Sequence, residues 1–349
     1  MADRSPPVET LGGLDPALVP SEAGIERIEG ETVLVTFPGF LAGDPVHCAS
    51  LVEAGLHIRF APKVGLRSPA EVIGLVGDAV GAIVSTDPFD AAVFEACHGL
   101  RVVARTGVGV DAIDLGAATA AGVVVTTTAG ANDQAAADHT LALMLAAARR
   151  VVEYDASVRR GSWARDASFV GCDLHGRTVG IIGLGSIGRA VARRLTGFDC
   201  STLGYDVAPA GVDGVEFTSL ADLLSRSDIV TVHVPLNETT EVLIGEPELA
   251  MLRADAILVN TSRGGVVDES ALYAALAGGR LRGAGLDVFI DEPPVGSPLL
   301  DLPNVVLTPH VAGLSTSSIA EMLRLASQSI LTVLQGGQPA FVANRDVFG

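Results

Sequence analysis

The sequence is poor in lysine, in aromatic residues and in charge. Lys63 is the only lysine among 23 basic residues, aromatic residues make up 4% of the 349 residues, and charged residues make up 18%. The 41 acidic residues outnumber the basic ones and give a net charge of −18. This balance argues against a nucleic-acid partner or an anionic membrane surface. We interpret the acidity as a solubility feature that carries no information about the ligand.

Long apolar runs and paired cysteines are also missing. The most apolar stretch, residues 140–148, is much shorter than the roughly 18 residues needed to span a bilayer. The first ten residues, MADRSPPVET, are polar, so no signal peptide is evident. The cysteines form no CxxC pair, which favours reduced thiols and a cytoplasmic protein; they are Cys48, Cys97, Cys172 and Cys200.

The residues that are present predict a large α/β protein. Hydrophobic residues make up 48% of the chain, enough for a sizeable core, and the length suggests two domains. Strand-like runs at 32–36, 82–84 and 101–104 alternate with helical patterns, which is typical of a parallel sheet. Two long helices are predicted, one from Asn132 to about Val152 and one over 316–335.

A glycine-rich turn gives the sharpest local signal. An apolar strand from Thr178 runs into GLGSIG (183–188), and a helical pattern follows. The glycines allow the tight turn, the approach of a pyrophosphate and the close packing of helix on strand, while the helix N-terminus attracts the phosphates. The next strand ends in Asp206, 18 residues beyond Gly188. A carboxylate there binds ribose hydroxyls and repels a 2′-phosphate, which predicts NAD over NADP; the alternative is a solvated acid.

Three ionisable residues follow strand-like runs further along the chain, namely Arg263, Glu292 and His310. Ligands of open parallel sheets bind beyond the carboxyl ends of the strands, so we expect the three in one crevice. A guanidinium can bind a carboxylate and polarise a carbonyl, an imidazolium can donate a proton, and a carboxylate can orient the imidazole. The set predicts reduction of a 2-keto acid by hydride transfer. Taken singly, Arg263 could instead be a surface base, Glu292 a turn acid and His310 a strand-end histidine.

The other histidines are predicted to be structural. His233 lies in a buried-looking strand and is expected to pack near the cofactor, and His139 is expected to have a minor structural role. None of the histidines shows metal-ligand spacing, so we predict no metal site.

These motifs resemble the D-isomer-specific 2-hydroxyacid dehydrogenases, the family of phosphoglycerate dehydrogenase and of glyoxylate and hydroxypyruvate reductases. The similarity covers most of residues 100–315. It is carried by RTGVGVDAIDLGAATAAGV (105–123), GANDQAAADHTLALMLAAARR (130–150), HGRTVGIIGLGSIGRAVARRL (175–195), HVPLNETTEVLIG (233–245), LVNTSRGGVVDESAL (258–272), GAGLDVFIDEPP (283–294) and LTPHVAG (307–313).

The resemblance implies a role for each matching residue. Arg263, Glu292 and His310 would be catalytic, and Val108 and Gly109 would bind substrate together with Arg263 and His310. The implied NAD contacts are Gly183, Gly185, Ser186, Ile187, Gly188, Asp206, Val234, Thr261, Asp287 and Gly313.

The resemblance also implies an architecture. Two α/β domains with parallel sheets, Rossmann-like and flavodoxin-like, are expected, with an NAD-binding domain (133–310) inserted into a substrate domain (30–132 plus 311–349). Residues 1–29 would form an N-terminal arm. The segment 151–172 would contribute to a homodimer, and the chain is expected to carry no C-terminal regulatory domain.

Two alternatives stay open at this stage. Phosphoglycerate dehydrogenases carry an arginine where this chain has Ser85, which puts a phosphorylated substrate in doubt, although Arg59, Lys63 or Arg67 could compensate. The chain could also be an NAD(H)-sensing binding protein of the C-terminal-binding-protein corepressor type. The absence of long disordered extensions favours the enzyme.

Overall fold

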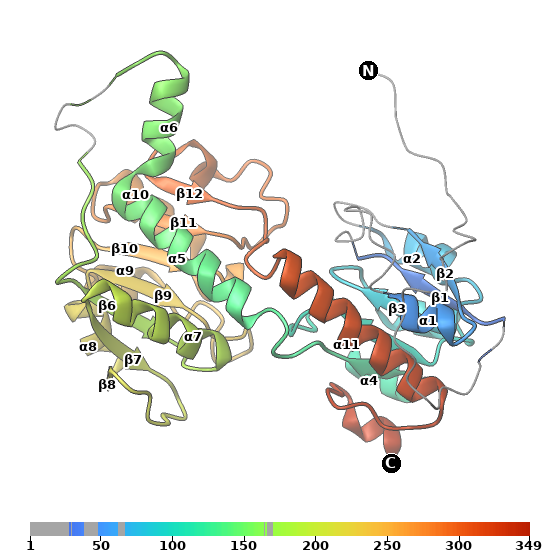
Figure 1. Cartoon of the computed structure of the whole chain (residues 1–349). Coiled ribbons are helices and arrows are strands. Elements are labelled where there is room, and N and C mark those ends of the chain that lie inside the picture. Colours follow the sequence, from blue (N-terminus) through green and yellow to red (C-terminus); the bar gives the residue numbers. More distant parts are fainter. Residues whose placement is uncertain (1–27, 29, 38–47, 62–66, 164, 166–169) are drawn as a thin grey trace. The chain divides into compact units, whose positions relative to one another are not determined.

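The computed structural model describes residues 28, 30–37, 48–61, 67–163, 165 and 170–349 (Figure 1). The chain divides into two compact units. Unit 1 extends to Ala129 and resumes at Ile319–Gly349, and unit 2 is Gly130–Ser318. The boundaries expected after residues 132 and 310 differ from these by three and eight residues. The expected arm, 1–29, lies outside the described residues except for Ile28.

Unit 1 is built on a five-stranded parallel sheet in the order β2-β1-β3-β4-β5, which is a flavodoxin-like arrangement. The strands are β1 (Thr32–Val35), β2 (His57–Phe60), β3 (Gly81–Val84), β4 (Val102–Arg105) and β5 (Val124–Thr126). The helices are α1 (Ala49–Glu53), α2 (Pro69–Val76), α3 (Ala91–Ala96), α4 (Leu115–Ala120), most of α11 (Thr316–Leu334) and the 3-10 turn η8 (Arg345–Phe348).

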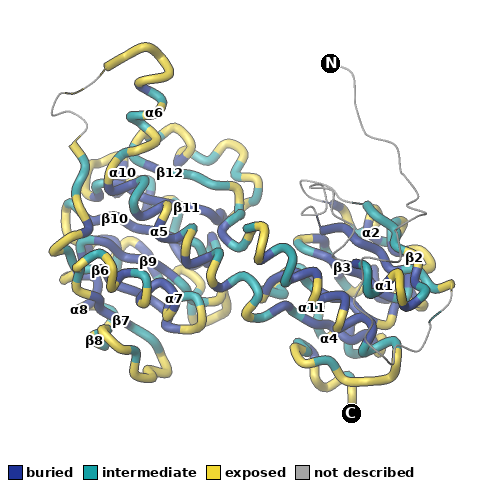
Figure 2. The backbone as a smooth tube through the Cα atoms, in the orientation of Figure 1, coloured by how far each residue is buried: buried dark blue, intermediate teal, exposed yellow. Residues whose placement is uncertain are grey.

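Local chemistry explains where the short helices of unit 1 begin. Ser68 and Glu71 form a capping box at the start of α2, and Asp90 and Asp114 accept first-turn N–H groups of α3 and α4. Each cap satisfies donors that the helix cannot satisfy itself. Strand β3 is buried along its whole length, as expected for a parallel sheet covered on both faces (Figure 2).

Unit 2 is built on a seven-stranded parallel sheet in the order β12-β11-β10-β9-β6-β7-β8, the Rossmann order with one further strand. The strands are β6 (Thr178–Ile182), β7 (Ser201–Tyr205), β8 (Val215–Phe217), β9 (Ile229–Val232), β10 (Ile257–Asn260), β11 (Gly283–Leu286) and β12 (Val305–Leu307). The helices are α5 (Asp133–Arg149), α6 (Val151–Arg159), α7 (Ser186–Leu195), α8 (Leu220–Arg226), α9 (Glu246–Met251) and α10 (Glu269–Ala277), with 3-10 turns η5 (Thr196–Phe198), η6 (Gly264–Val266) and η7 (Pro298–Asp301). The expected α/β fold with two parallel sheets is confirmed.

Helix α5 ends earlier than the sequence pattern predicts. The helix expected to reach about Val152 ends at Arg149, and Arg150 adopts left-handed backbone angles (φ 54°, ψ 38°) before α6 begins at Val151. An L-residue in this conformation breaks the helical hydrogen-bond ladder. The Arg150 guanidinium then pairs with Glu153 in the first turn of α6. The turn therefore separates two helices where the prediction placed one.

Two further observations concern membrane-spanning helices and the state of the cysteines. No described helix is both long enough and apolar enough to cross a membrane. All four cysteines lie in the described part of the chain and are free thiols, with Cys48 and Cys97 buried.

Candidate active site

Three neighbouring strands of unit 2 end beside the predicted catalytic residues. Arg263 follows β10, Glu292 lies in the loop after β11, and His310 follows β12. These strands are adjacent and parallel, so their carboxyl ends lie at one edge of the sheet. The structure thus brings all three to the same edge, where open α/β sheets bind ligands.

Glu292 and His310 form a directly bonded pair. His310 Nδ1 lies 2.7 Å from Glu292 Oε2, and the Phe289 N–H donates to Glu292 Oε1 at 3.1 Å. Burial alone would raise the pKa of Glu292, but the hydrogen bond and charge of His310, the Phe289 N–H and the charge of Arg263 together hold it below its usual value. Glu292 is therefore an ionised acceptor that fixes the imidazole and leaves Nε2 for a ligand.

Asp287 holds the loop that carries His310. Its side chain is completely buried, and its carboxylate accepts hydrogen bonds from Val311 N at 2.9 Å, Ala312 N at 2.8 Å and Thr308 Oγ1 at 2.6 Å. The Asp287 carbonyl oxygen accepts the His310 N–H at 2.8 Å. His310 has φ 53°, an uncommon conformation for a non-glycine residue that the surrounding bonds must maintain. The predicted contact of Asp287 with NAD stays a prediction.

Asn260 shapes the loop of Arg263 in a similar way. Its side chain is buried, donates to the Arg263 carbonyl at 2.8 Å, and accepts from the Ser262 backbone and hydroxyl at 3.0 and 2.7 Å. Gly264 packs so tightly that a Cβ would lie 2.0 Å from the Phe289 carbonyl carbon. This approach joins the Arg263 loop to the segment that leads to Glu292. Sequence reasoning missed Asn260, although a polar residue ending an apolar strand was the available signal.

The glycine-rich turn fits a pyrophosphate. A Cβ on Gly188 would lie 2.0 Å from the Gly183 carbonyl oxygen, whereas a Cβ on Gly185 would meet no atom within 4 Å. Gly185 is the N-cap of α7 and offers no side-chain oxygen to the first-turn N–H groups. The turn therefore combines close packing inside with open space and uncapped donors outside, as an anion site requires. Ser186 is exposed and Ile187 is half-buried at the start of this helix.

Asp206 lies at the end of β7, next to this turn. Its Oδ2 accepts the Leu184 N–H at 2.7 Å and its Oδ1 accepts the Ala208 N–H at 2.9 Å. These bonds fix a half-buried carboxylate beside the turn, with oxygens that can accept further bonds. This is the arrangement expected of a ribose-binding acid.

The remaining predicted cofactor residues also belong to unit 2. A Cβ on Gly183 would lie 2.9 Å from Val234 Cγ1, and one on Gly313 would lie 2.6 Å from Asn132 Nδ2, so both glycines permit close contacts. Thr261 Oγ1 lies 2.9 Å from Thr140 Oγ1 of α5. The roles of Val234, Thr261 and Gly313 toward a cofactor stay predictions.

The predicted substrate loop lies in unit 1, at the carboxyl end of β4. The Gly107 N–H donates to Thr128 Oγ1 at 2.7 Å, and Val108 is 49% exposed. Arg105 packs over this loop: its Nη1 donates to the Thr106 carbonyl at 2.7 Å, and a Cβ on Gly107 would lie 1.5 Å from it. Sequence reasoning did not assign Arg105, although it opens the RTGVGVD run. The roles of Val108 and Gly109 stay predictions.

Comparison with known proteins identifies the family. Residues 141–312 match the model "D-isomer specific 2-hydroxyacid dehydrogenase, NAD binding domain". A glyoxylate reductase of Korarchaeum cryptofilum is 47% identical over 276 residues, covering 76% of this chain and 83% of that protein. A D-3-phosphoglycerate dehydrogenase of Mycobacterium tuberculosis is 45% identical over 254 residues, 69% of this chain and 48% of the relative. The crystal structure of the TT0316 protein of Thermus thermophilus aligns with a TM-score of 0.82 and 39% identity, covering 89% of this chain and 99% of that one.

The chain belongs to the D-isomer specific 2-hydroxyacid dehydrogenase family. The matched model is the family's NAD-binding domain and lies within unit 2, which makes NAD the cofactor of this unit. The chain spans about half the length of the phosphoglycerate dehydrogenases it matches. Because the relatives are a reductase and a dehydrogenase, they support a 2-hydroxyacid dehydrogenase over a corepressor-type binding protein.

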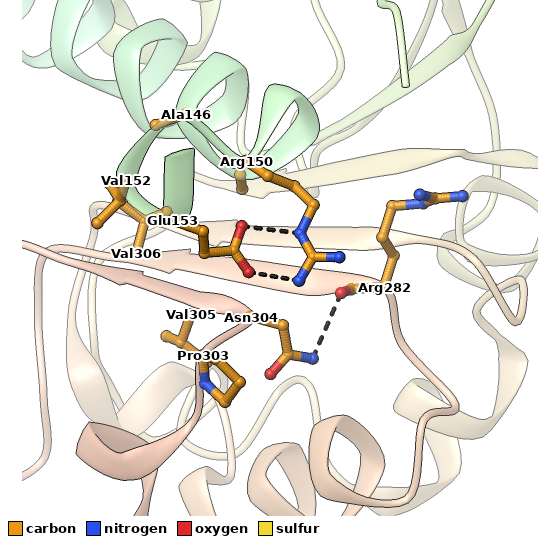
Figure 3. Close-up of a pocket in the computed structure, with 10 residues that line it drawn as sticks. Ala146, Arg150, Val152, Glu153, Arg282, Pro303, Asn304, Val305 and Val306 are labelled. Carbon is orange, nitrogen blue, oxygen red and sulfur yellow. Dashed lines mark hydrogen bonds and ion pairs between the residues drawn. The ribbon is translucent and has the colours of Figure 1, made fainter. Parts of the chain in front are cut away.

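Besides the dehydrogenase site, unit 2 has a small pocket at the corner between α5 and α6 (Figure 3). Arg150 donates to both carboxylate oxygens of Glu153, and Asn304 Nδ2 donates to the Arg282 carbonyl at 3.3 Å. The Arg282 guanidinium points away from this group in Figure 3. The charges of Arg150 and Glu153 are thus paired with each other, and none of the predicted catalytic residues lines the pocket. Among the described residues, no group of three or more His, Cys, Asp or Glu side chains forms a metal site.

His233 leads to a prediction about acid stability. Burial lowers its pKa to about 4, and its Nε2 lies 3.0 Å from Thr231 Oγ1. Because the unfolded chain binds the proton with a pKa near 6.5, the neutral histidine favours folding above pH 6.5, and this advantage is lost as the pH falls toward 4. His233→Gln should therefore flatten the pH dependence of the unfolding free energy between pH 6.5 and 4 by up to about 3 kcal/mol.

Urea denaturation of the two proteins at pH 4.5, 5.5, 6.5 and 7.5 measures the effect. His175→Gln is the matched control, because His175 is exposed and its removal should leave the slope unchanged. Equal slopes for the wild type and His233→Gln would contradict the assignment.

Proposed function

We propose that the chain interconverts a small D-2-hydroxy acid and its 2-keto acid, with NAD as the hydride carrier. The observation that carries this proposal is the Glu292–His310 pair, bonded at 2.7 Å, with the charge of Arg263 close enough to lower the pKa of Glu292. The glycine-rich turn and Asp206 supply the nucleotide site of the same unit. Unit 1 would be the substrate domain, with Val108 and Gly109 contributing to keto-acid binding.

Each catalytic side chain has one task in this mechanism. Bound NAD(H) supplies or takes up the hydride. Arg263 pairs with the substrate carboxylate and draws electron density from the carbonyl that is reduced. His310, protonated and held at Nδ1 by Glu292, donates the Nε2 proton to the developing alkoxide; in the oxidative direction its neutral form takes this proton back. Glu292 stays ionised throughout and stabilises the imidazolium.

The contacts of Arg59 and Arg67, the two described residues that could compensate for Ser85, support an unphosphorylated substrate. Ser85 offers no charge, and Arg67 is buried in an ion pair with Asp87, which also accepts a hydrogen bond from Thr36 at 2.5 Å. Arg59 bonds to Asp78 and donates to the carbonyls of residues 75 and 76, both at 3.1 Å. Lys63 lies outside the described residues. Neither described arginine that could replace the missing one is free to hold a phosphate.

A panel of keto acids tests the substrate. NADH oxidation would be followed with glyoxylate, hydroxypyruvate, pyruvate, 2-ketobutyrate and 3-phosphohydroxypyruvate. We expect glyoxylate or hydroxypyruvate to give the highest kcat/KM, at least about tenfold above the phosphorylated acid, because a charged phosphate without a partner is costly to bury. A preference for 3-phosphohydroxypyruvate would overturn the unphosphorylated class. Tight NADH binding without turnover of any acid would favour the binding-protein alternative.

Asp206 should set the cofactor preference. Asp206→Ala removes the acceptor of the ribose hydroxyls and the charge that repels a 2′-phosphate. We expect NADH to bind about tenfold more weakly and the preference over NADPH to narrow by at least that factor. Fluorescence titration with both cofactors measures this. Asp213→Ala removes an equal charge from an exposed position of the same unit and should change neither; an unchanged preference in Asp206→Ala would refute the role.

We propose further that the enzyme is a homodimer of the cytoplasm. Helix α6 and the chain after it expose Val151 (52%), Val152 (51%), Val158 (54%) and Trp163 (76%) to solvent. Several exposed apolar side chains on one helix and the segment after it are typical of an interface. The free thiols support a reducing compartment. Light scattering should give twice the chain mass, and a monomer would contradict the dimer.

A further inference from the structure

Helix α5 contacts the loop of His310 through a short chain of polar groups. His139 Nε2 lies 2.9 Å from Thr308 Oγ1, and Thr308 Oγ1 donates to Asp287 Oδ1 at 2.6 Å. His139 Nε2 is also 3.6 Å from that carboxylate oxygen. Asp287 is fully buried and His139 is 23% exposed. The chain therefore connects a partly accessible imidazole to the buried carboxylate.

The hydrogen bonds that link His139, Thr308 and Asp287 can run in only one direction. A threonine hydroxyl has one hydrogen, and Thr308 gives it to Asp287. Thr308 Oγ1 must then accept from His139, so Nε2 of His139 carries a hydrogen and acts as a donor. The direction of the bonds is His139 to Thr308 to Asp287. A side chain at position 139 that cannot donate would leave Thr308 Oγ1 without a donor, although it would still donate to Asp287.

Asp287, the last member of this series of hydrogen bonds, holds the backbone around His310. The carboxylate of Asp287 also accepts from the backbone N–H groups of Val311 and Ala312, and its carbonyl accepts from His310 N. Any rotation of the Asp287 side chain would release these N–H groups and with them the left-handed turn at His310. His139 is thus connected to the backbone of His310 through Thr308 and Asp287.

The next residue of α5 makes a similar contact to the loop of Arg263. Thr140 Oγ1 donates to the Ala136 carbonyl at 2.8 Å, so it accepts from the Thr261 hydroxyl, 2.9 Å away. Thr261 lies two residues before Arg263. Helix α5 packs along β10, β11 and β12, and two consecutive residues of this 17-residue helix contact the loops of His310 and Arg263.

We propose that His139 and Thr140 are positioning residues, His139 for the proton donor His310 and Thr140 for the carboxylate-binding Arg263. The inference rests on the proposed function, because it assigns those two roles. Its consequence is a division of effects: His139 acts on the proton-transfer step, and Thr140 acts on keto-acid binding. A merely structural role would lower the amount of folded enzyme and leave the kinetic constants of the folded fraction unchanged.

Four variants separate these effects. His139→Leu removes the donor, while His139→Gln keeps an N–H group at the position of Nε2; Thr140→Val and Thr140→Ser form the corresponding pair. The quantities to be measured are kcat and KM with NADH and the best keto acid, NADH affinity by fluorescence, the affinity of the NADH complex for oxamate by calorimetry, and the melting temperature. His175→Gln is the control at an exposed histidine.

We expect His139→Leu to lower kcat about 10- to 100-fold, because small misplacements of catalytic groups cost this much. NADH affinity should stay within about twofold, and His139→Gln should recover kcat to within about threefold of wild type. Thr140→Val should raise KM for the keto acid and Kd for oxamate about tenfold with kcat nearly unchanged, and Thr140→Ser should restore both. Combining His139→Leu with Thr308→Val should cost no more than the worse single variant, since both break the same chain.

Several outcomes would overturn the inference. Wild-type kcat in His139→Leu, with His310→Ala inactive, would leave the proposed function standing and remove the role of His139. Equal losses in folded His139→Gln and His139→Leu would show that donation is not what matters. If the losses of kcat in His139→Leu and Thr308→Val add in the double variant, the two residues act independently, and the hydrogen bond between them does not carry the effect. Activity that survives in His310→Ala would instead reject the proposed function itself.

Discussion

Replacing His310 by alanine should lower kcat for keto-acid reduction about 10³-fold and leave NADH affinity within about twofold of wild type. The variant loses the proton donor, and the alkoxide must then take its proton from water. NADH affinity is preserved because the proposed nucleotide contacts lie elsewhere on the sheet: the glycine-rich turn follows β6 and Asp206 follows β7, whereas His310 follows β12. Stopped-flow oxidation of NADH under single-turnover conditions measures the chemical step directly.

The partner of His310 provides a second measurement. Glu292→Gln keeps a hydrogen-bond acceptor beside Nδ1 but removes the charge that favours the imidazolium, so it should lower kcat by a smaller factor, about 10²-fold. Because the two side chains act as one unit, the double variant should be no slower than His310→Ala. His175→Ala, at an exposed position, should behave as wild type. A His310→Ala enzyme with more than a tenth of wild-type kcat would exclude His310 as the donor.

Arg263→Ala should lower kcat/KM for the keto acid about 10⁴-fold, since it removes both the carboxylate partner and the group that polarises the carbonyl. Arg263→Lys keeps the charge but cannot bind a carboxylate with two parallel bonds, so we expect it to recover only about 10- to 100-fold of this loss. Steady-state kinetics with oxamate inhibition separate binding from chemistry. Arg226→Lys, at an exposed ion pair with Glu216, is the control.

The pH profile of Arg263→Ala adds an independent check. The charge of Arg263 helps to hold the pKa of Glu292 below its usual value. Removing it raises this pKa, so residual activity should fall at a higher pH on the acid side than in wild type. An acid limb at the same pH in both proteins would mean that Arg263 does not act on Glu292. Unchanged KM and oxamate affinity in Arg263→Ala would reject its role as the carboxylate partner.

The features that could be predicted from sequence are those set by short-range chemistry. The turn at Gly183–Gly188 follows a strand and opens a helix, so the close packing of its glycines and the place of Asp206 beside it can be inferred from one continuous stretch. Arg263, Glu292 and His310 could be inferred because parallel strands bring their carboxyl ends to one edge. Their residue types then suggested the chemistry.

The features that were missed depend on side chains that meet only in the folded chain. His139, Asp287 and Thr308 come from a helix, a strand end and a later loop, and no spacing in the sequence relates them. The sequence therefore predicts no more than a minor structural role for His139, and its contact with Thr308 becomes visible only in the fold. The end of α5 was misplaced for a different reason: a left-handed arginine, stabilised by Glu153, leaves no signal like that of a glycine or proline.

His310, Glu292, Arg263 and the glycine-rich turn, to which we assign the chemistry, all belong to one uninterrupted stretch, Gly130–Ser318. Unit 1, which carries the loop proposed to face the keto acid, is encoded on both sides of that stretch. Recombination at two points of the gene, near residues 129 and 318, would exchange unit 2 between relatives and leave unit 1 unchanged. If the proposed roles hold, substitutions that change the substrate range would fall in the two flanking segments of the gene, and the residues of the reaction would stay together in the central segment.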